Sequence, residues 1–383
     1  MRVLHVFKTY YPDSFGGVEQ VIRQIALSAA SHGVESRVFT LSKSTSHTRR
    51  VRESGTDVIQ APVHLDVAST PMSLSALKPF REACAWADVI HYHFPWPFGD
   101  LLHLLARPGK PTVLTYHSDV VKQQVLLQFY RPLMTYLLRS MDAIVGTSPN
   151  YVRTSETLAA FQDKVSVIPI GVQESSYPVP SREKLDHWRG RFGEKFFLFV
   201  GVIRYYKGLH ILLDAMAGTN FPVVIVGSGP FEQQLREQAA RLGLQNLHFV
   251  GALPDEDKVA LFKLCYGVVF PSHLRSEAYG ITLLEGAMSG KPLISLEIGT
   301  GSSYINLDGE TGLVVPPDDP GALREAMERL YRTPELAAKM GARARARFEK
   351  MFTADRMSEA YVDLYRKVLA AVPVQPRVST GPG

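Results

Sequence analysis

The stretch PSHLRSEAYGITLLEGAMSGKP, residues 271–292, lies between two short apolar segments, GVVF at 267–270 and LISL at 293–296. It contains two glutamates, Glu277 and Glu285, with seven residues between them. The residues that follow Glu277, AYGIT, have the character of a first helical turn, and apolar residues then recur at helical spacing. The pattern predicts a strand, a loop, a helix and a second strand. A helix N-terminus presents unpaired N–H groups and a positive dipole end, which suits a phosphate.

The two glutamates could be read as the acid and the nucleophile or base of a glycosidase. Eight residues at a rise of about 1.5 Å place Glu277 and Glu285 about 12 Å apart along a helix. Paired glycosidase carboxyls need about 5–9.5 Å. The spacing fits better with two glutamates that bind the two ends of one elongated ligand. Such a ligand would be anionic in its middle, as a sugar–diphosphate–ribose molecule is. Spacing alone also leaves open, and slightly favours, a plainer alternative in which one glutamate is a solvated helix residue and the other a loop acid.

Length and composition describe a globular chain of 383 residues with a net charge of +5. The two cysteines, Cys84 and Cys265, lie in apolar segments far apart, so we expect no disulfide framework and a cytoplasmic setting. Met1 and Arg2 lead directly into a predicted strand, and we expect neither a signal peptide nor a membrane span. The mild basicity suits anionic ligands or an anionic membrane surface, and no nucleic-acid-binding signature is present.

Short apolar segments alternate with helical patterns along the whole chain. This alternation predicts parallel sheets with helices on both faces. The fold class is therefore α/β, with two Rossmann-like doubly wound domains whose strand ends face a central cleft. We predict strands at 2–7, 36–41, 57–61, 88–93, 111–116, 142–147 and 164–168, and then at 196–201, 222–227, 246–250, 267–270, 292–296 and 311–315.

A segment rich in proline and serine, at 171–190, separates the two halves of the chain. We predict a first domain at 1–175 and a second at 190–353. A last helical pattern, at 354–371, follows Thr353, which is a candidate N-cap. The tail from Val372 is rich in proline and glycine, and we expect it to be disordered.

Two loops after predicted strands have residues that suit a phosphate. Gly16 and Gly17 follow the first strand, and their backbone N–H groups could approach an anion, although the spacing of a dinucleotide fingerprint is missing. Arg204 and Lys207 follow the first strand of the second domain, where two cations could neutralise a diphosphate. An ordinary turn is the alternative for each loop.

Histidines end two neighbouring strands. His91 and His93 close the strand at 88–93, and His117 and Asp119 follow the next one. A metal site of the hydrolase kind is one interpretation. We expect His91 and His93 to point to opposite faces of their strand, so that at most one faces the cleft. On this basis we predict no metal site.

The pattern of two glutamates with seven residues between them, followed by Gly290-Lys291-Pro292, resembles the signature of the retaining glycosyltransferases of family 4. The resemblance extends over nearly the whole chain, from the glycine loop to the last helix. It implies the two-domain GT-B fold, a nucleotide-sugar donor, no obligatory metal, and a last helix that returns to the first domain.

The resemblance also implies roles for individual residues. Glu277 would hold hydroxyls of the transferred sugar and His117 would lie beside that sugar, while Glu285 would hold the ribose. Weaker candidates for orienting the acceptor are His93 and Asp119. Three residues, Leu253, Asp255 and Lys258, would lie against the nucleotide base, although the residues alone describe only an acidic helix start. The leaving diphosphate would be stabilised by Arg204, Lys207, the amides of Gly16 and Gly17, and the N–H groups around Tyr279, Gly280 and Ile281.

In overall character the chain resembles bacterial enzymes that build lipopolysaccharide O-antigen from GDP-sugars such as GDP-mannose or GDP-rhamnose. This implies a lipid-linked glycan acceptor and a peripheral place on the cytoplasmic face of the inner membrane. Residues 122–141 could form an interfacial helix or a packed crossover helix. Two rivals are a sugar-nucleotide epimerase of the same fold and a metal-dependent hydrolase that uses His91 or His93 with His117.

Overall fold

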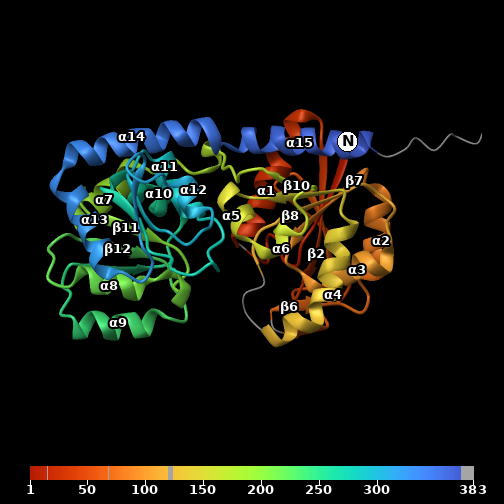
Figure 1. Ribbon diagram of the computed structural model, residues 1–383, viewed down its shortest axis with the longest axis horizontal. Helices are drawn as coiled ribbons and strands as arrows, with labels where there is room; N and C mark the ends of the chain where they lie inside the picture. The colour runs from red at the N-terminus through yellow and green to blue at the C-terminus, as the bar shows by residue number, and fades with distance from the viewer. Residues whose placement is uncertain (15, 68, 120–123, 372–383) are drawn as a thin grey trace, which may run out of the picture.

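The computed structural model describes residues 1–14, 16–67, 69–119 and 124–371, and two separate sheets organise them (Figure 1). All strands of the first sheet are parallel apart from the edge strand β3, which runs antiparallel to β4. In spatial order this sheet contains β10 (Val165–Val167), β9 (Ala143–Gly146), β8 (Thr112–Tyr116), β7 (Val89–Phe94), β1 (Arg2–Val6), β2 (Glu35–Ser42), β4 (Thr56–Pro62) and β3 (Arg49–Glu53).

The second sheet is parallel throughout. Its spatial order is β13 (Leu247–Gly251), β12 (Val223–Val226), β11 (Phe197–Val200), β14 (Gly267–Phe270), β15 (Leu293–Leu296) and β16 (Gly312–Val315). Central strands such as β11 and β14 are buried at every residue, as expected for parallel strands covered on both faces. A small antiparallel hairpin, β5 (Leu65–Val67) with β6 (Thr70–Met72), stands apart from both sheets.

Helices pack around the two sheets. The first half of the chain contributes α1 (Gly17–Ala29), α2 (Leu77–Trp86), α3 (Pro97–Ala106), α4 (Gln124–Ser140), α5 (Pro149–Thr154) and α6 (Glu156–Ala159). The second half contributes α7 (Arg182–Phe192), α8 (Leu209–Met216), α9 (Glu232–Arg241), α10 (Asp255–Leu264), α11 (Ile281–Met288), α12 (Ser302–Ile305), α13 (Pro320–Arg332), α14 (Pro334–Met351) and α15 (Ala354–Ala370). Three short 3-10 turns, η1 (Ala30–His32), η2 (Glu174–Ser176) and η3 (Tyr205–Lys207), complete the described elements.

The last helix connects the two halves of the molecule. In Figure 1, α14 lies over the second sheet, and α15 continues from it across the elements of the first. Thr353 caps α15, since its side chain accepts a hydrogen bond from the backbone N–H of Arg356. Two buried tyrosines anchor the helix, because the Tyr361 hydroxyl lies 2.8 Å from Thr115 Oγ1 and the Tyr365 hydroxyl 2.7 Å from His91 Nδ1.

Every strand predicted from the sequence is present within one residue of its predicted ends. The prediction missed β3, β5 and β6. The helix of the two-glutamate stretch begins later than expected, at Ile281, because Gly280 has a left-handed backbone with φ of 103°. Glu277 therefore lies in a loop and only Glu285 lies on the helix.

Both cysteines are buried and free. The expectation for the tail from Val372 falls outside the described residues.

Helix α4 occupies most of the segment for which two interpretations were open, of which residues 122 and 123 are not described. It continues through Pro132. Within the described residues, none of the helices combines the length and the apolar character that crossing a bilayer would need.

Candidate active site

A buried ion pair lies where β14 and β11 end. Glu277, which is 9% exposed, accepts hydrogen bonds from Lys207 Nζ and from Ser272 Oγ, the latter at 3.0 Å. Burial works against the charge of Lys207, but the Glu277 carboxylate outweighs it, and the pKa of Lys207 is raised. The two residues that the sequence placed at the sugar and the diphosphate are therefore direct partners. The pair is a fixed polar centre at the carboxyl ends of the second sheet.

Two further cations extend this region, since the charge of Arg204 acts on Lys207 and also on Lys8. Arg204 is exposed at the start of the η3 turn. Lys8, which follows β1 of the first sheet, has a lowered pKa because it is desolvated and because the charge of Arg204 reaches it. Lys8 was not among the predicted site residues, although its place directly after a strand was a usable signal. Cations from both sheets thus approach one region, which suits a multiply charged anion.

The glycine loop is built around Glu19. This buried carboxylate accepts hydrogen bonds from Thr9 Oγ1 at 2.8 Å and from Ser14 Oγ at 2.7 Å. A Cβ at Gly16 would lie 2.4 Å from Glu19 Oε2, so a side chain at that position would displace the carboxylate. A Cβ at Gly17 would lie 3.6 Å from Ile281 Cδ1. The start of α1 therefore faces the start of α11, as the predicted site requires.

The turn before α11 is held rigidly. Gly280 combines its left-handed backbone with close neighbours, since a Cβ there would lie 3.2 Å from the Phe270 ring. The Tyr279 side chain is buried, and its hydroxyl donates to the carbonyl oxygen of Ile170 at 3.1 Å. Only the backbone of Tyr279 is then available to a ligand, and the N–H groups around Gly280 stay the predicted anion contacts.

Glu285 forms a second acidic position, further along α11. Tyr177, in the segment between the domains, donates its hydroxyl to Glu285 Oε1 at 3.1 Å and accepts from Gln20 Nε2 at 3.2 Å. Desolvation raises the pKa of Glu285 to about 7, although Lys258 and the Tyr177 hydroxyl act in the opposite direction. Tyr177 was another residue that sequence reasoning missed, because its two partners lie 157 and 108 residues away.

The predicted base-binding residues lie around the start of α10. Asp255 and Lys258 form an ion pair with each other, and the charges of both act on Glu285. Leu253 lies in the wall of a hollow of about 430 Å³ that α7 also lines. The structure thus brings Asp255 and Lys258 to Glu285, whereas Leu253 lines a hollow whose other lining residues do not include them.

The pKa of Glu285 leads to a prediction about stability. Its folded pKa of about 7 exceeds the ordinary 4.5, so the folded protein binds this proton more tightly than the unfolded chain. Stability contributed by the neutral carboxyl is present below pH 4.5 and is lost as pH rises through 7. Glu285→Gln should therefore raise the melting temperature relative to wild type more at pH 8 than at pH 5. Melting curves of both proteins, with Glu325→Gln on an exposed face of α13 as control, check this. An equal difference at both pH values would contradict it.

The histidines form a buried chain, and one expectation about them was wrong. His91 and His93 share a face of β7, with ring centroids 4.2 Å apart, because strand side chains alternate with period two. His117 Nε2 lies 3.0 Å from His93 Nδ1, and His93 Nε2 lies 3.1 Å from His5 Nδ1. Burial lowers the pKa of His117 to about 3, so His117 is neutral at pH 7. A neutral ring can both donate and accept a hydrogen bond.

The metal alternative can be tested on this geometry. Ligand atoms of His5, His91 and His93 lie within 4.8 Å of one another. Both nitrogens of His91 already bond to Tyr365 and Thr115, and those of His93 bond to His117 and His5. A metal would have to replace several of these hydrogen bonds. The arrangement fits a polar chain behind His117 better than a metal centre.

Comparisons with known proteins place the chain in a family. Residues 15–176 match the profile of Glycosyltransferase Family 4, and residues 183–347 match that of Glycosyl transferases group 1. The D-rhamnosyltransferase WbpZ of Pseudomonas aeruginosa is 57% identical over 92% of this chain and 93% of its own length. The O-antigen chain mannosyltransferase C of Escherichia coli is 54% identical over 96% of this chain and 99% of its own.

A solved structure adds the fold. Sucrose-phosphate synthase of Thermosynechococcus elongatus superposes with a TM-score of 0.78 at 21% identity, covering 97% of this chain and 100% of its own. The two sheets, parallel apart from the edge strand β3, and the returning α15 match the predicted GT-B architecture. The chain therefore belongs to the glycosyltransferases of the GT-B fold.

Proposed function

We propose that the protein is a retaining hexosyltransferase of family 4 that transfers a mannose- or rhamnose-like sugar from a GDP-sugar to a lipid-linked glycan in O-antigen synthesis. The buried Lys207–Glu277 pair carries the proposal, because it joins a cation for the diphosphate to a carboxylate for sugar hydroxyls at one point. The two relatives above 50% identity support the sugar, since their names are those of a rhamnosyl- and a mannosyltransferase.

The donor would lie mainly in the second domain, at 190–353, and the acceptor mainly in the first, at 1–175. Glu285 holds the ribose and Asp255 with Lys258 holds the base. The diphosphate lies among Arg204, Lys207, Lys8 and the amides of Gly16, Gly17 and Gly280. The three cations and the backbone N–H groups stabilise the negative charge that develops on the leaving group. The domain limits and the individual roles are part of the proposal.

The reaction itself needs no covalent intermediate with the enzyme. The bond between the sugar C1 and the diphosphate oxygen breaks while the acceptor oxygen attacks C1 from the same face. The acceptor proton passes to the departing phosphate oxygen, which keeps the charges balanced. Glu277 and neutral His117 fix the sugar by hydrogen bonds, and no metal is required in this scheme.

A thermal-shift panel with GDP, UDP and ADP, each with and without EDTA, tests the donor. Ligand at about 100 times its dissociation constant adds about 2.7 kcal/mol to the free energy of unfolding. Of the three nucleotides, we expect only GDP to raise the melting temperature, and we expect EDTA to leave that rise unchanged. A shift selective for UDP would contradict the GDP assignment. No nucleotide shift together with a large loss in EDTA would favour a metal-dependent hydrolase. An epimerase would convert a GDP-sugar to an isomer without acceptor, which chromatography would detect.

The lipid-linked acceptor implies contact with a membrane surface, and α4 is the proposed contact. Phe129 is 81% exposed and Tyr136 is 42% exposed on this helix. Arg131 and Arg139 lie beside Tyr136 in the wall of a hollow of about 410 Å³. Aromatic and basic side chains together suit an anionic bilayer surface. Sedimentation with anionic vesicles should carry down the wild type and less of Phe129→Ser, and no sedimentation of either would contradict the proposal.

A further inference from the structure

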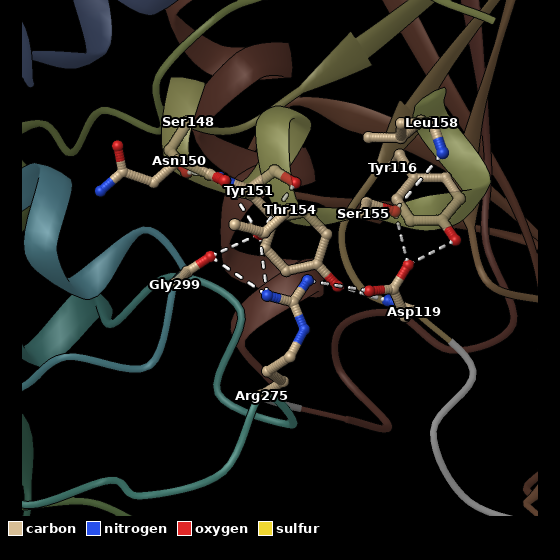
Figure 2. Close-up of polar contacts among 10 residues, drawn as sticks. All are labelled: Tyr116, Asp119, Ser148, Asn150, Tyr151, Thr154, Ser155, Leu158, Arg275 and Gly299. Carbon is tan, nitrogen blue, oxygen red and sulfur yellow. Dashed lines mark hydrogen bonds and ion pairs between the residues drawn. The ribbon is translucent and has the colours of Figure 1, made fainter. Parts of the chain in front are cut away.

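The loop that carries Glu277 also reaches into the first domain through Arg275. In Figure 2 the Arg275 side chain extends from this loop toward residues of the first domain. Its Nη2 lies 3.1 Å from Asp119 Oδ2, and its Nη1 donates to Thr154 Oγ1 at 2.8 Å. Nη1 also lies 3.2 Å from the Gly299 carbonyl oxygen of its own domain. One guanidinium therefore bridges the loop after β8, the end of α5 and the loop after β15.

Hydrogen bonds within the first domain hold the Asp119 carboxylate that pairs with this cation. Its other oxygen, Oδ1, accepts from the Tyr116 hydroxyl at 3.0 Å and from Ser155 Oγ at 2.8 Å. Its backbone N–H donates to the Tyr151 hydroxyl at 2.6 Å, and the Arg275 guanidinium lies 5.2 Å from the centre of the Tyr151 ring. Figure 2 shows these residues gathered around the carboxylate. The first domain thus orients Asp119 whether or not Arg275 is present.

The position of the pair in the sequence suggests its use. Arg275 stands two residues before Glu277, and Asp119 stands two residues after His117. We propose that Arg275 and Asp119 are a positioning pair that sets the Glu277 loop against the His117 loop when the two domains meet. This inference rests on the proposed sugar-binding roles of Glu277 and His117. Neither Arg275 nor Asp119 needs to touch the sugar.

The contact is partly exposed, so it can form and break reversibly. The Arg275 side chain is 32% exposed and that of Asp119 is 22% exposed, so water screens the pair. Its neighbours across the interface are also polar, with Thr154 Oγ1 2.7 Å from the Gly299 oxygen and Asn150 Nδ2 3.0 Å from Ser303 Oγ. Polar interfaces between domains separate more readily than apolar ones. The pair therefore aligns the two loops without fixing the domains permanently together.

A double-mutant cycle tests the pair. Arg275→Gln and Asp119→Asn should each lower kcat by roughly ten- to a hundredfold, as expected when reacting groups are displaced by about 1 Å. The KM for the donor should change little, because the ribose and base contacts lie elsewhere. The double variant should be no slower than the slower single variant, since both changes break one interaction. The kcat of Arg275→Lys should lie between those of the wild type and Arg275→Gln, because a lysine ammonium can reach one of the two acceptors but lacks the two-pronged geometry of the guanidinium.

Arg332→Gln on α13 is the matched control, since it removes an ion pair confined to one helix. Hydrogen exchange of the α5 amides, measured without substrate, should rise in Arg275→Gln and not in the control. Unchanged kcat in the singles, losses that multiply in the double variant, or unchanged exchange would each overturn the inference. Absence of transfer by the wild type with any GDP- or UDP-sugar would overturn the proposed function instead. The exchange result would still decide whether the pair holds the domains together.

Discussion

Glu277→Gln should reduce kcat/KM for sugar transfer by about 10²–10³, the range found when one preorganised polar contact to a transition state is lost. Glutamine keeps the shape of the side chain and can still accept from Ser272 Oγ, 3.0 Å away in the wild type. It removes the negative charge that pairs with Lys207 and that would accept two sugar hydroxyls strongly. Initial rates with GDP-mannose and a lipid-linked acceptor, measured over donor concentration, check this.

The control for this variant is Glu310→Gln, an exposed glutamate in the turn before β16. It should keep wild-type kinetics. GDP binding to Glu277→Gln should weaken less than transfer does, because the ribose is proposed to contact Glu285. Full activity of Glu277→Gln would remove the central element of the proposed site.

The strands were predictable because parallel strands covered on both faces are apolar throughout, and this signal is local. β3, with sequence RRVRE, lacks that signal, since it is an edge strand whose charged side chains reach solvent. The helix start was misplaced because a helical pattern does not reveal that Gly280 adopts a left-handed backbone.

The candidate site was predictable only in part. Glu277, Glu285, Arg204 and Lys207 stand at strand ends or on the adjoining helix, where topology alone directs them to the cleft. The prediction that His91 and His93 point to opposite faces was wrong because residues two apart in a strand share a face.

Other contacts depend on segments brought together by folding. His5 meets His93 across 88 residues, and Arg275 meets Asp119 across 156. No local pattern in one sequence specifies such a pairing. Lys8 is intermediate, because its place after β1 was visible while its nearness to Arg204 was not.

Lys207→Met should abolish most transfer, with kcat falling by about 10³ or more, because it removes the buried cation proposed to face the leaving diphosphate. Methionine keeps the apolar stem but leaves the Glu277 carboxylate buried without its charged partner. Breaking one side of a buried ion pair costs about 3–5 kcal/mol of stability. The two side chains are only 11% and 12% exposed, so solvent compensates little. Denaturant unfolding and initial rates measured on the same preparation check both effects.

The double variant Lys207→Met/Glu277→Gln separates the two roles of the pair. It has neither buried charge, so it should recover most of the stability that Lys207→Met loses. A purely structural pair would let activity return together with stability. If Lys207 instead neutralises the diphosphate, the double variant transfers sugar more slowly than Glu277→Gln alone, although it unfolds near the wild-type denaturant concentration. Recovery of both properties would show that the pair only holds the loop, and catalysis would then have to rely on Arg204 and Lys8.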